Sequence, residues 1–305
     1  MGRFIARRLV MLIPVLIGVS IMSFLILHLA PGDPAELLAG EEATQQDIIR
    51  VRHQFGLDKP LYVQYFRFVK GIFDGELKSL KFELPVIDVI GPRLVNTLEL
   101  SLASIVIAVV IGMLAGVLSA THRYSWIDYI STVVALMGVS LPVFWWGLLL
   151  ILLFAVKIGI LPSGGMGGFS HLILPAVVLG TASTAIIARM TRSSMLDVLR
   201  QDYITTARSK GLVERIVVYR HALRNALIPT VTVVGLQFGY MLAGAVLTET
   251  VFSWPGVGRL LVDSILSRDF PVVQASLLII AGVFVLVNLA VDIIYALLDP
   301  RIRYE

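Results

Sequence analysis

Six stretches of the chain are each long and apolar enough to cross a lipid bilayer as a helix. A helix needs about 20 predominantly apolar residues to span the hydrocarbon core. Each stretch is apolar around its whole circumference, which is typical of a helix in lipid or inside a helical bundle. The stretches are 9–29, 98–120, 130–156, 172–188, 227–247 and 272–298. The sequence therefore predicts an all-α integral membrane protein with six transmembrane helices.

The composition agrees with a membrane location and excludes several classes of protein. Hydrophobic residues make up 57% of the chain and charged residues 15%, whereas a soluble domain carries about 25% charged residues. An ordinary cytosolic enzyme is therefore excluded. The chain has no cysteine, so disulfides, thiolate metal sites and cysteine nucleophiles are excluded as well.

The positions of Lys and Arg predict that both termini are cytoplasmic, because cytoplasmic loops of membrane proteins carry an excess of these residues. With the N-terminus inside, fourteen basic residues fall on inner segments and three on short outer ones. Eight more lie in one long outer loop, which counts little because long loops translocate largely regardless of charge.

This orientation predicts three parts of the chain. Residues 1–30 form an N-terminal signal-anchor transmembrane helix, because the apolar run 9–29 is too long for a cleaved signal peptide. Residues 31–97 form an extracytoplasmic loop that opens with Pro31-Gly-Asp-Pro34. Residues 98–305 form a five-helix core with a cytoplasmic loop near 189–226. The long loop either caps the bundle or docks an outside partner.

The cytoplasmic loop between the fourth and fifth stretches predicts two short helices. Asp202 is a plausible N-cap, and Tyr203, Ile204 and Ala207 are able to share one face of the helix that follows. Gly211 suits the position after a helix end, where a left-handed backbone turns the chain. An amphipathic helix of this kind lies on lipid or fits a groove in a partner. The alternative is a positively charged loop that is simply solvated.

Motifs in this loop resemble a known family. Thr206-Ala-Arg-Ser-Lys-Gly211 and Arg220-His-Ala-Leu-Arg-Asn-Ala-Leu-Ile-Pro229 are similar to the EAA loop of dipeptide/oligopeptide/nickel-type ABC importer permeases, and most to the B-type dipeptide permeases. Thr205 and Thr206 replace the Glu and first Ala of the general signature. The likeness runs nearly end to end, through 31–34, 55–60, 144–147, 173–176, 190–195, 247–256 and 299–303.

The resemblance implies a MetI-like permease fold and a role in a larger complex. In this family the EAA loop forms a coupling helix that sits in a groove of an ATPase subunit. The residues implied for this contact, with Arg208 and Lys210 at its rim, are Thr205, Thr206, Ala207, Arg208, Lys210 and Gly211. The resemblance also implies a homologous second permease, one or two ATPase subunits, an extracytoplasmic solute-binding protein and the cytoplasmic membrane of a prokaryote.

The chain itself has no signature of ATP binding. It lacks a Gly-x4-Gly-Lys-Ser/Thr phosphate loop, so ATP and Mg²⁺ are expected on partner subunits, with no cofactor, metal site or catalytic residue in this chain. The implied substrates are di- or oligopeptides. Glutathione, a nickel chelate and haem remain alternatives within the same family.

Polar residues inside the apolar stretches are candidates for the transport pathway, because such residues are costly in a membrane. Gln237 and Tyr240 are three residues apart on the fifth stretch. In the third stretch, Gly138, Ser140 and Pro142 are able to break the helix and expose backbone carbonyls, which either lines the pathway or merely kinks the helix. Asp292 on the sixth stretch is predicted to form a structural ion pair with a basic residue near the cytoplasmic end.

Two pairs of glycines with Gly-x-x-x-Gly spacing allow close approach of helices. They are Gly112/Gly116 and Gly235/Gly239. They serve either packing inside this subunit or contact with a second subunit.

Two other functions compete with the importer subunit. An ion-coupled secondary transporter working alone is disfavoured by the single acid, Asp292, recognised inside the spans. An intramembrane enzyme is disfavoured because the chain has no His-Glu-x-x-His or Gly-x-Ser-x-Gly motif. The five histidines are scattered over both predicted sides, which argues against a metal site.

Overall fold

The computed structural model describes residues 2–29, 32–40 and 43–298, and the regular structure within these ranges is helical. Pro31 and the basic residues Arg301 and Arg303, on which some predictions depend, lie outside the described residues. The chain divides into two compact units. One contains Gly2–Thr97 and Pro255–Leu286, and the other contains Leu98–Trp254 and the segment that begins at Val287.

The first unit, which we call the N-terminal unit, is built around the first and last long helices. Phe24 of α1 contacts Tyr65 and Phe68 of α4, and its carbonyl oxygen accepts a hydrogen bond from Gln274 of α13 (2.9 Å). The unit contains α1 (Gly2–Leu29), α2 (Pro34–Ala39), α3 (Gln45–Gln54), α4 (Leu61–Phe73), α12 (Val257–Leu266), the start of α5 (Val86–Thr121) and most of α13 (Phe270–Leu298).

Local sequence explains where the short helices of this unit begin. Thr44 and Asp47 form a capping box in which each side chain satisfies a backbone N–H of the other residue. The hydrogen bonds from Thr44 hold the pKa of the Asp47 carboxyl below its ordinary value. At α2, Asp33 caps the helix and Pro34 occupies its first position, where the missing N–H costs nothing.

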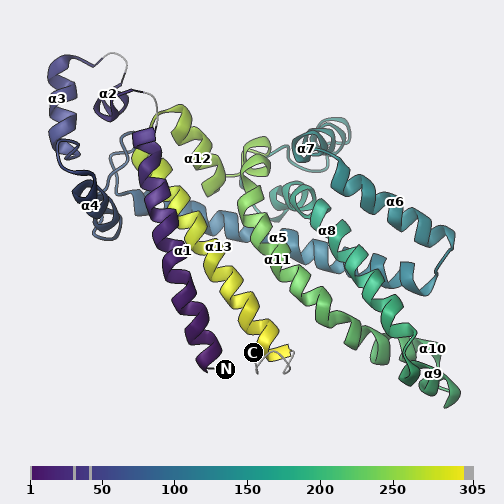
Figure 1. Ribbon diagram of the computed structural model, residues 1–305. Helices are drawn as coiled ribbons and strands as arrows, with labels where there is room; N and C mark the ends of the chain where they lie inside the picture. Colours follow the sequence, from purple (N-terminus) through teal and green to yellow (C-terminus); the bar gives the residue numbers. More distant parts are fainter. Residues whose placement is uncertain (1, 30–31, 41–42, 299–305) are drawn as a thin grey trace. The chain divides into compact units, whose positions relative to one another are not determined.

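The second unit, which we call the core unit, is built around α8, which packs against both α6 and α11. In Figure 1, α6 and α11 run beside α8, and α9 and α10 lie at the end of α8 and α11. The unit contains the rest of α5, α6 (Trp126–Ser140), α7 (Val143–Leu150), a π-helical segment η1 (Ile151–Lys157), α8 (Phe169–Leu199), α9 (Asp202–Ser209), α10 (Glu214–Ile216), a second π-helical segment η2 (Val217–Ala222) and α11 (Leu223–Val251).

The predicted spans agree with the helices, with one exception in shape. Five helices are long and apolar enough to cross a membrane, and the pair 126–140 and 143–157 passes the same test when taken together. That pair is bent by 109°, so the third span is broken. The break falls at Leu141 and Pro142, inside the segment where the sequence predicted it. Proline lacks the backbone N–H that would continue the helix, and it disfavours helical backbone in the preceding residue.

One glycine pair has a clear packing role inside the chain. A Cβ added to Gly112 would lie 2.8 Å from the carbonyl oxygen of Thr184, and one added to Gly116 would lie 2.6 Å from that of Ala188. Both distances are too short for a real side chain. Gly112 and Gly116 therefore let α5 approach the backbone of α8 closely, as small residues do in membrane helices. Gly235 of the other pair faces the side chain of Val291 in the same way.

Candidate functional site

The helix α9 has the boundaries of a short, separate helix. Gln201 is its N-cap, with an extended backbone, and Asp202 is its first residue. The prediction that Asp202 is the N-cap is therefore wrong by one residue, although a carboxylate in the first turn still favours the helix dipole. At the other end Lys210 is the C-cap, and Gly211 has a φ of +78°. The prediction that Gly211 turns the chain is confirmed.

One face of α9 is buried against the core unit. Ile204 is 0% exposed and Ala207 is 8% exposed. They join a cluster to which α5, α8 and the start of the following helix all contribute, namely Val117, Ala120, Met195, Val217, Val218, Ala222 and Ala226. Tyr203, which was expected to share this face, is instead 42% exposed, and its hydroxyl accepts a hydrogen bond from Asn225 of α11 (2.7 Å).

The other face of α9 is polar and open. Thr205, Thr206 and Lys210 are exposed, as is Gly211. Arg208 makes a two-pronged ion pair with Glu214 across the turn, with Nη2–Oε1 at 2.6 Å and Nε–Oε2 at 3.1 Å. This carboxylate raises the pKa of Arg208. The pair links the end of α9 to the start of α10, so the turn at Gly211 is held from both sides.

Apolar side chains continue this open face beyond the turn. Leu212, Val213, Ile216 and Tyr219 are between 38% and 66% exposed. A contiguous group of exposed apolar side chains rimmed by polar ones marks a surface that contacts another protein or the membrane. The open face therefore comprises the polar residues of α9 and this apolar group.

The second short helix of the predicted pair is not separate. The three-residue α10 continues through η2 into α11, so that 214–251 form one helical run. The π-helical turns of η2 allow this continuity, because such turns insert residues without ending a helix. The open face is thus attached directly to a long membrane helix.

The residues predicted to line the pathway lie in different surroundings. Ser140 ends α6 at the bend and is exposed. Gln237 is half-buried, and its Oε1 accepts a hydrogen bond from Ser183 of α8 (2.9 Å). Tyr240 is 63% exposed. The pathway assignment for these three residues stays a prediction.

Asp292 lies half-buried on α13, and its predicted ion pair stays a prediction. Among residues 2–29, 32–40 and 43–298, no group of three or more His, Cys, Asp or Glu side chains is arranged to hold a metal ion.

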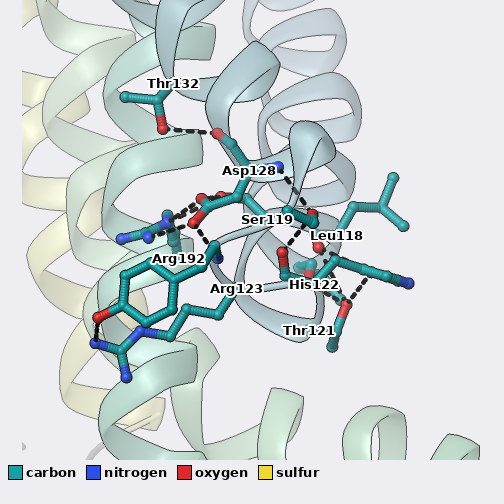
Figure 2. A network of polar contacts seen from close by, with 11 residues as sticks. Leu118, Ser119, Thr121, His122, Arg123, Asp128, Thr132 and Arg192 are labelled. Carbon is teal, nitrogen blue, oxygen red and sulfur yellow. Dashed lines mark hydrogen bonds and ion pairs between the residues drawn. The ribbon is translucent and has the colours of Figure 1, made fainter.

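Sequence reasoning missed an ion pair between a buried Asp and a half-buried Arg in the core unit. Asp128, in the first turn of α6, is 4% exposed and binds Arg192 of α8 through both carboxylate oxygens, at 2.8 and 2.9 Å (Figure 2). An acid in the first turn of an apolar span was the available signal, but 64 residues separate the two partners. Arg192 had been counted only as one basic residue of the cytoplasmic loop.

Glu249 was also missed. It lies near the end of α11, is 0% exposed and sits inside the motif 247–256. A buried carboxyl within a membrane helix is costly and marks a site worth mutating. The backbone carbonyl oxygen of Glu249 accepts a hydrogen bond from the backbone N–H of Trp254 (2.8 Å), and this bond fixes the turn that follows α11.

Comparison with known proteins identifies the family. Residues 108–304 match the family described as binding-protein-dependent transport system inner membrane component, and residues 1–83 match its N-terminal component. The chain belongs to this family. It is therefore a permease component of an ABC importer, and the catalytic ATPase is not this subunit.

Relatives of this permease are known over its full length. It is 46% identical to the dipeptide transport system permease protein DppB of Alkalihalophilus pseudofirmus, over 98% of each chain. It is 48% identical to the glutathione transport system permease protein GsiC of Escherichia coli K12, over 100% of each chain.

Solved structures show the fold. A structure of the MetNI methionine ABC transporter in inward-facing conformations matches 70% of this permease and 98% of its own chain, with a TM-score of 0.62 at 19% identity. An amino acid ABC transporter structure matches 70% of this permease and 94% of its own chain, with a TM-score of 0.52 at 17% identity. The permease thus has the MetI-like fold expected from its sequence.

Proposed function

We propose that this permease moves di- or oligopeptides across the cytoplasmic membrane of a prokaryote. Its similarity to the dipeptide permease DppB supports peptides, and its similarity to GsiC supports glutathione, itself a small peptide, as the alternative. A homologous second permease completes the pathway, and a solute-binding protein delivers the substrate from outside.

The open face of α9 is the structural observation that supports a role as an importer subunit. One side of the helix is buried against α5, α8 and α11, while Thr205, Thr206 and Lys210 face outward. A helix anchored on one face and free on the other transmits force from a partner into the helices behind it. We assign α9 as the coupling helix, with Thr205, Thr206, Ala207, Arg208, Lys210 and Gly211 as its functional residues.

The role of each residue follows from its place. Ala207 anchors the helix inward, and Gly211 supplies the turn at its end. Thr205, Thr206 and Lys210 contact the ATPase directly, while Arg208 holds Glu214 and so shapes the turn. ATP and Mg²⁺ bind the partner ATPases on the cytoplasmic side, where the distribution of Lys and Arg predicts both termini.

The pathway runs past the break in the third span and the exposed side of α11. Ser140 ends α6 at the break, and Gln237 and Tyr240 lie on α11, which packs against α7 on the other side of the break. Asp292, half-buried on α13, contributes a structural ion pair rather than a transport step.

Substitution of Thr206 by Asp tests the coupling helix. Thr206 is exposed, so the permease still folds, while a new carboxylate on the open face repels or displaces the ATPase. We expect the Thr206→Asp complex to lose most uptake. The matched control is Ser170→Asp. Ser170 is exposed and lies at the start of α8, whereas α9 follows the end of α8. Equal uptake by Thr206→Asp and the control would refute the assignment of α9.

Purification of tagged permease from its native membrane in mild detergent tests the partners. We expect a second permease and one or two ATPases to co-purify, as identified by mass spectrometry. Uptake of a labelled dipeptide in competition with glutathione then decides between the two substrates. A permease that purifies alone, under conditions that preserve a known ABC complex, would contradict the proposed function.

A further inference from the structure

A cluster of polar side chains joins three membrane helices near α9. Ser119 of α5, Asp128 of α6 and Arg192 of α8 bind one another, and the backbone N–H of Tyr124 donates to Asp128 (3.1 Å). We call Ser119, Asp128 and Arg192 the clamp. In Figure 2 the carboxylate of Asp128 lies between Arg192 and Ser119.

The geometry of the clamp is closely defined. The guanidinium of Arg192 donates Nε–H to Oδ1 and Nη2–H to Oδ2 of Asp128, the paired arrangement that only a planar fork provides. Ser119 donates to Asp128 and accepts from Nε of Arg192 (2.9 Å). Tyr124 has a φ of +62°, an unfavourable backbone for a residue with a side chain, and this turn aims its N–H at the carboxylate.

Stability alone does not account for such a pair. Well-packed apolar residues of similar volume often replace a buried ion pair with no loss of stability, because they avoid the desolvation of two charges. What an ion pair adds is a defined relative position of the two elements that carry it. The clamp therefore sets where α6 lies along α8.

The clamp shares its helices with the cluster that holds α9. Val117 and Ala120 of α5 flank Ser119, and Met195 lies one turn from Arg192 on α8; all three pack with Ile204 and Ala207 of α9. No residue of α6 belongs to this cluster among the described residues. A displacement of α9 is thus transmitted to α5 and α8 through apolar contacts. The bonds of Asp128 to Ser119 and Arg192 connect α6 to the same two helices.

The far end of α6 reaches the break in the third span. A Cβ added to Gly138 would lie 3.1 Å from Cγ2 and 3.3 Å from the carbonyl oxygen of Thr181 on α8. The hydroxyl of Thr181 accepts a hydrogen bond from Trp146 of α7 (3.2 Å). α6 packs along α8, with the clamp near one end and the close approach at Gly138 near the other. It therefore connects the clamp with the bend at Pro142.

We propose that Asp128 and Arg192 are positioning residues that make α5, α6 and α8 move as one body when α9 is displaced, so that the stroke of the ATPase reaches the broken span. This proposal rests on the proposed function of α9 as the coupling helix. Without the clamp, α9 still moves α8, but α6 is held to α8 by apolar packing alone and follows it less closely.

Removing the pair without stranding a charge tests the proposal. The double substitution Asp128→Leu/Arg192→Met is reconstituted with the partner subunits and binding protein in liposomes. Uptake of a labelled dipeptide and ATP hydrolysis are measured on the same preparation. We expect uptake per ATP hydrolysed to fall about tenfold, as for loss of a typical coupling between sites, while hydrolysis changes less than about twofold.

Two further variants complete this comparison. Arg189→Gln, an exposed basic residue one turn away on α8, is the matched control and should leave uptake per ATP unchanged. Ser119→Ala keeps both charges and should lower uptake per ATP by about threefold, because its hydrogen bonds to Asp128 and Arg192 are lost. This variant tests the proposal even if the double variant fails to assemble. Proportional loss of uptake and hydrolysis in both clamp variants would show a merely structural role. A wild-type complex without ATP hydrolysis would instead overturn the proposed function.

Distance measurements test the rigid body directly. Because the permease has no cysteine, Ile130→Cys on α6 and Asp197→Cys on α8 provide two labelling sites, both exposed, in a complex whose partners are also cysteine-free. With spin labels at these sites, we expect the same distance with and without bound nucleotide in the wild-type background and a nucleotide-dependent distance in Asp128→Leu/Arg192→Met. A nucleotide-dependent distance in the wild-type background would overturn the proposal.

Discussion

Two buried aspartates, one in each unit, both accept from a serine hydroxyl and backbone N–H groups, but only one of them also binds an arginine. Asp128 in the core unit faces the guanidinium of Arg192 and joins two long helices. Asp269 in the N-terminal unit is 1% exposed and accepts from the Ser79 hydroxyl and the backbone N–H groups of Leu80, Lys81 and Val272. Asp269 thereby caps the start of α13 and fastens a loop to it.

The difference shows how a carboxylate is used for movement and for anchorage. The N–H groups of Leu80 and Lys81 belong to the backbone of one loop, so Asp269 holds that loop in a single arrangement at the start of α13. An arginine side chain reaches from a separate helix, so Asp128 sets the relation between two helices that are otherwise connected through apolar contacts. We therefore expect changes at Asp128 to affect transport and changes at Asp269 to affect only stability.

The largest expected effect is that of Asp128→Ala. It leaves the Arg192 charge partly buried without its partner, and breaking such a pair should lower the free energy of unfolding by about 3 kcal/mol. Denaturation of the purified permease in mixed micelles measures this value. An unchanged stability would mean that water already compensates Arg192, whose side chain is 32% exposed.

Asp269→Asn should have a smaller effect on stability and none on coupling. The amide retains one acceptor oxygen but points N–H groups at N–H donors, so the free energy of unfolding should fall by about 2 kcal/mol. Uptake per ATP in the assembled complex should equal that of the wild type. A loss of uptake per ATP here would remove the distinction between the two aspartates.

Ser119→Ala should lower the free energy of unfolding by about 1 kcal/mol, because it removes a hydroxyl that both donates and accepts inside the clamp. The same denaturation assay measures it. Thr132→Val serves as the control, since the Thr132 hydroxyl bonds only the carbonyl oxygen of Asp128 within its own helix. Its effect should be clearly smaller.

The smallest expected change in stability is that of Asp128→Leu/Arg192→Met, within about 1 kcal/mol of the wild type. Together with the expected loss of uptake per ATP, this would separate the positioning role of the clamp from stability. A double variant as unstable as Asp128→Ala would show that the clamp is needed to hold the helices together.

Much of the architecture follows from local sequence. The six spans are long apolar runs whose minimum length is set by the bilayer, and the break in the third follows from Pro142 and its neighbours. Gly211 and the short helix before it were also predicted, because helix ends depend on a few adjacent residues. The one-residue error at Asp202 is typical of a boundary set by backbone geometry at Gln201.

The second of the two short helices predicted in the loop near 189–226 was not predictable in the same way. Residues 214–216 carry charges and an apolar residue, which suit a short surface helix. The structure instead continues them through a π-helical segment into α11, because Val217 and Val218 are buried beside α9. Tertiary packing, rather than propensity, decides whether such a short segment stands alone.

The sequence by itself determined the class of protein, the number of apolar spans and the family, because each depends on patterns within a short length of chain. Only the tertiary structure decided which charges meet. Asp128 and Arg192 are both ordinary charged residues when read along the chain, and Glu249 is the single acid of the motif 247–256. Their burial arises from the packing of helices distant in sequence, and that packing gives a charge a partner and a role.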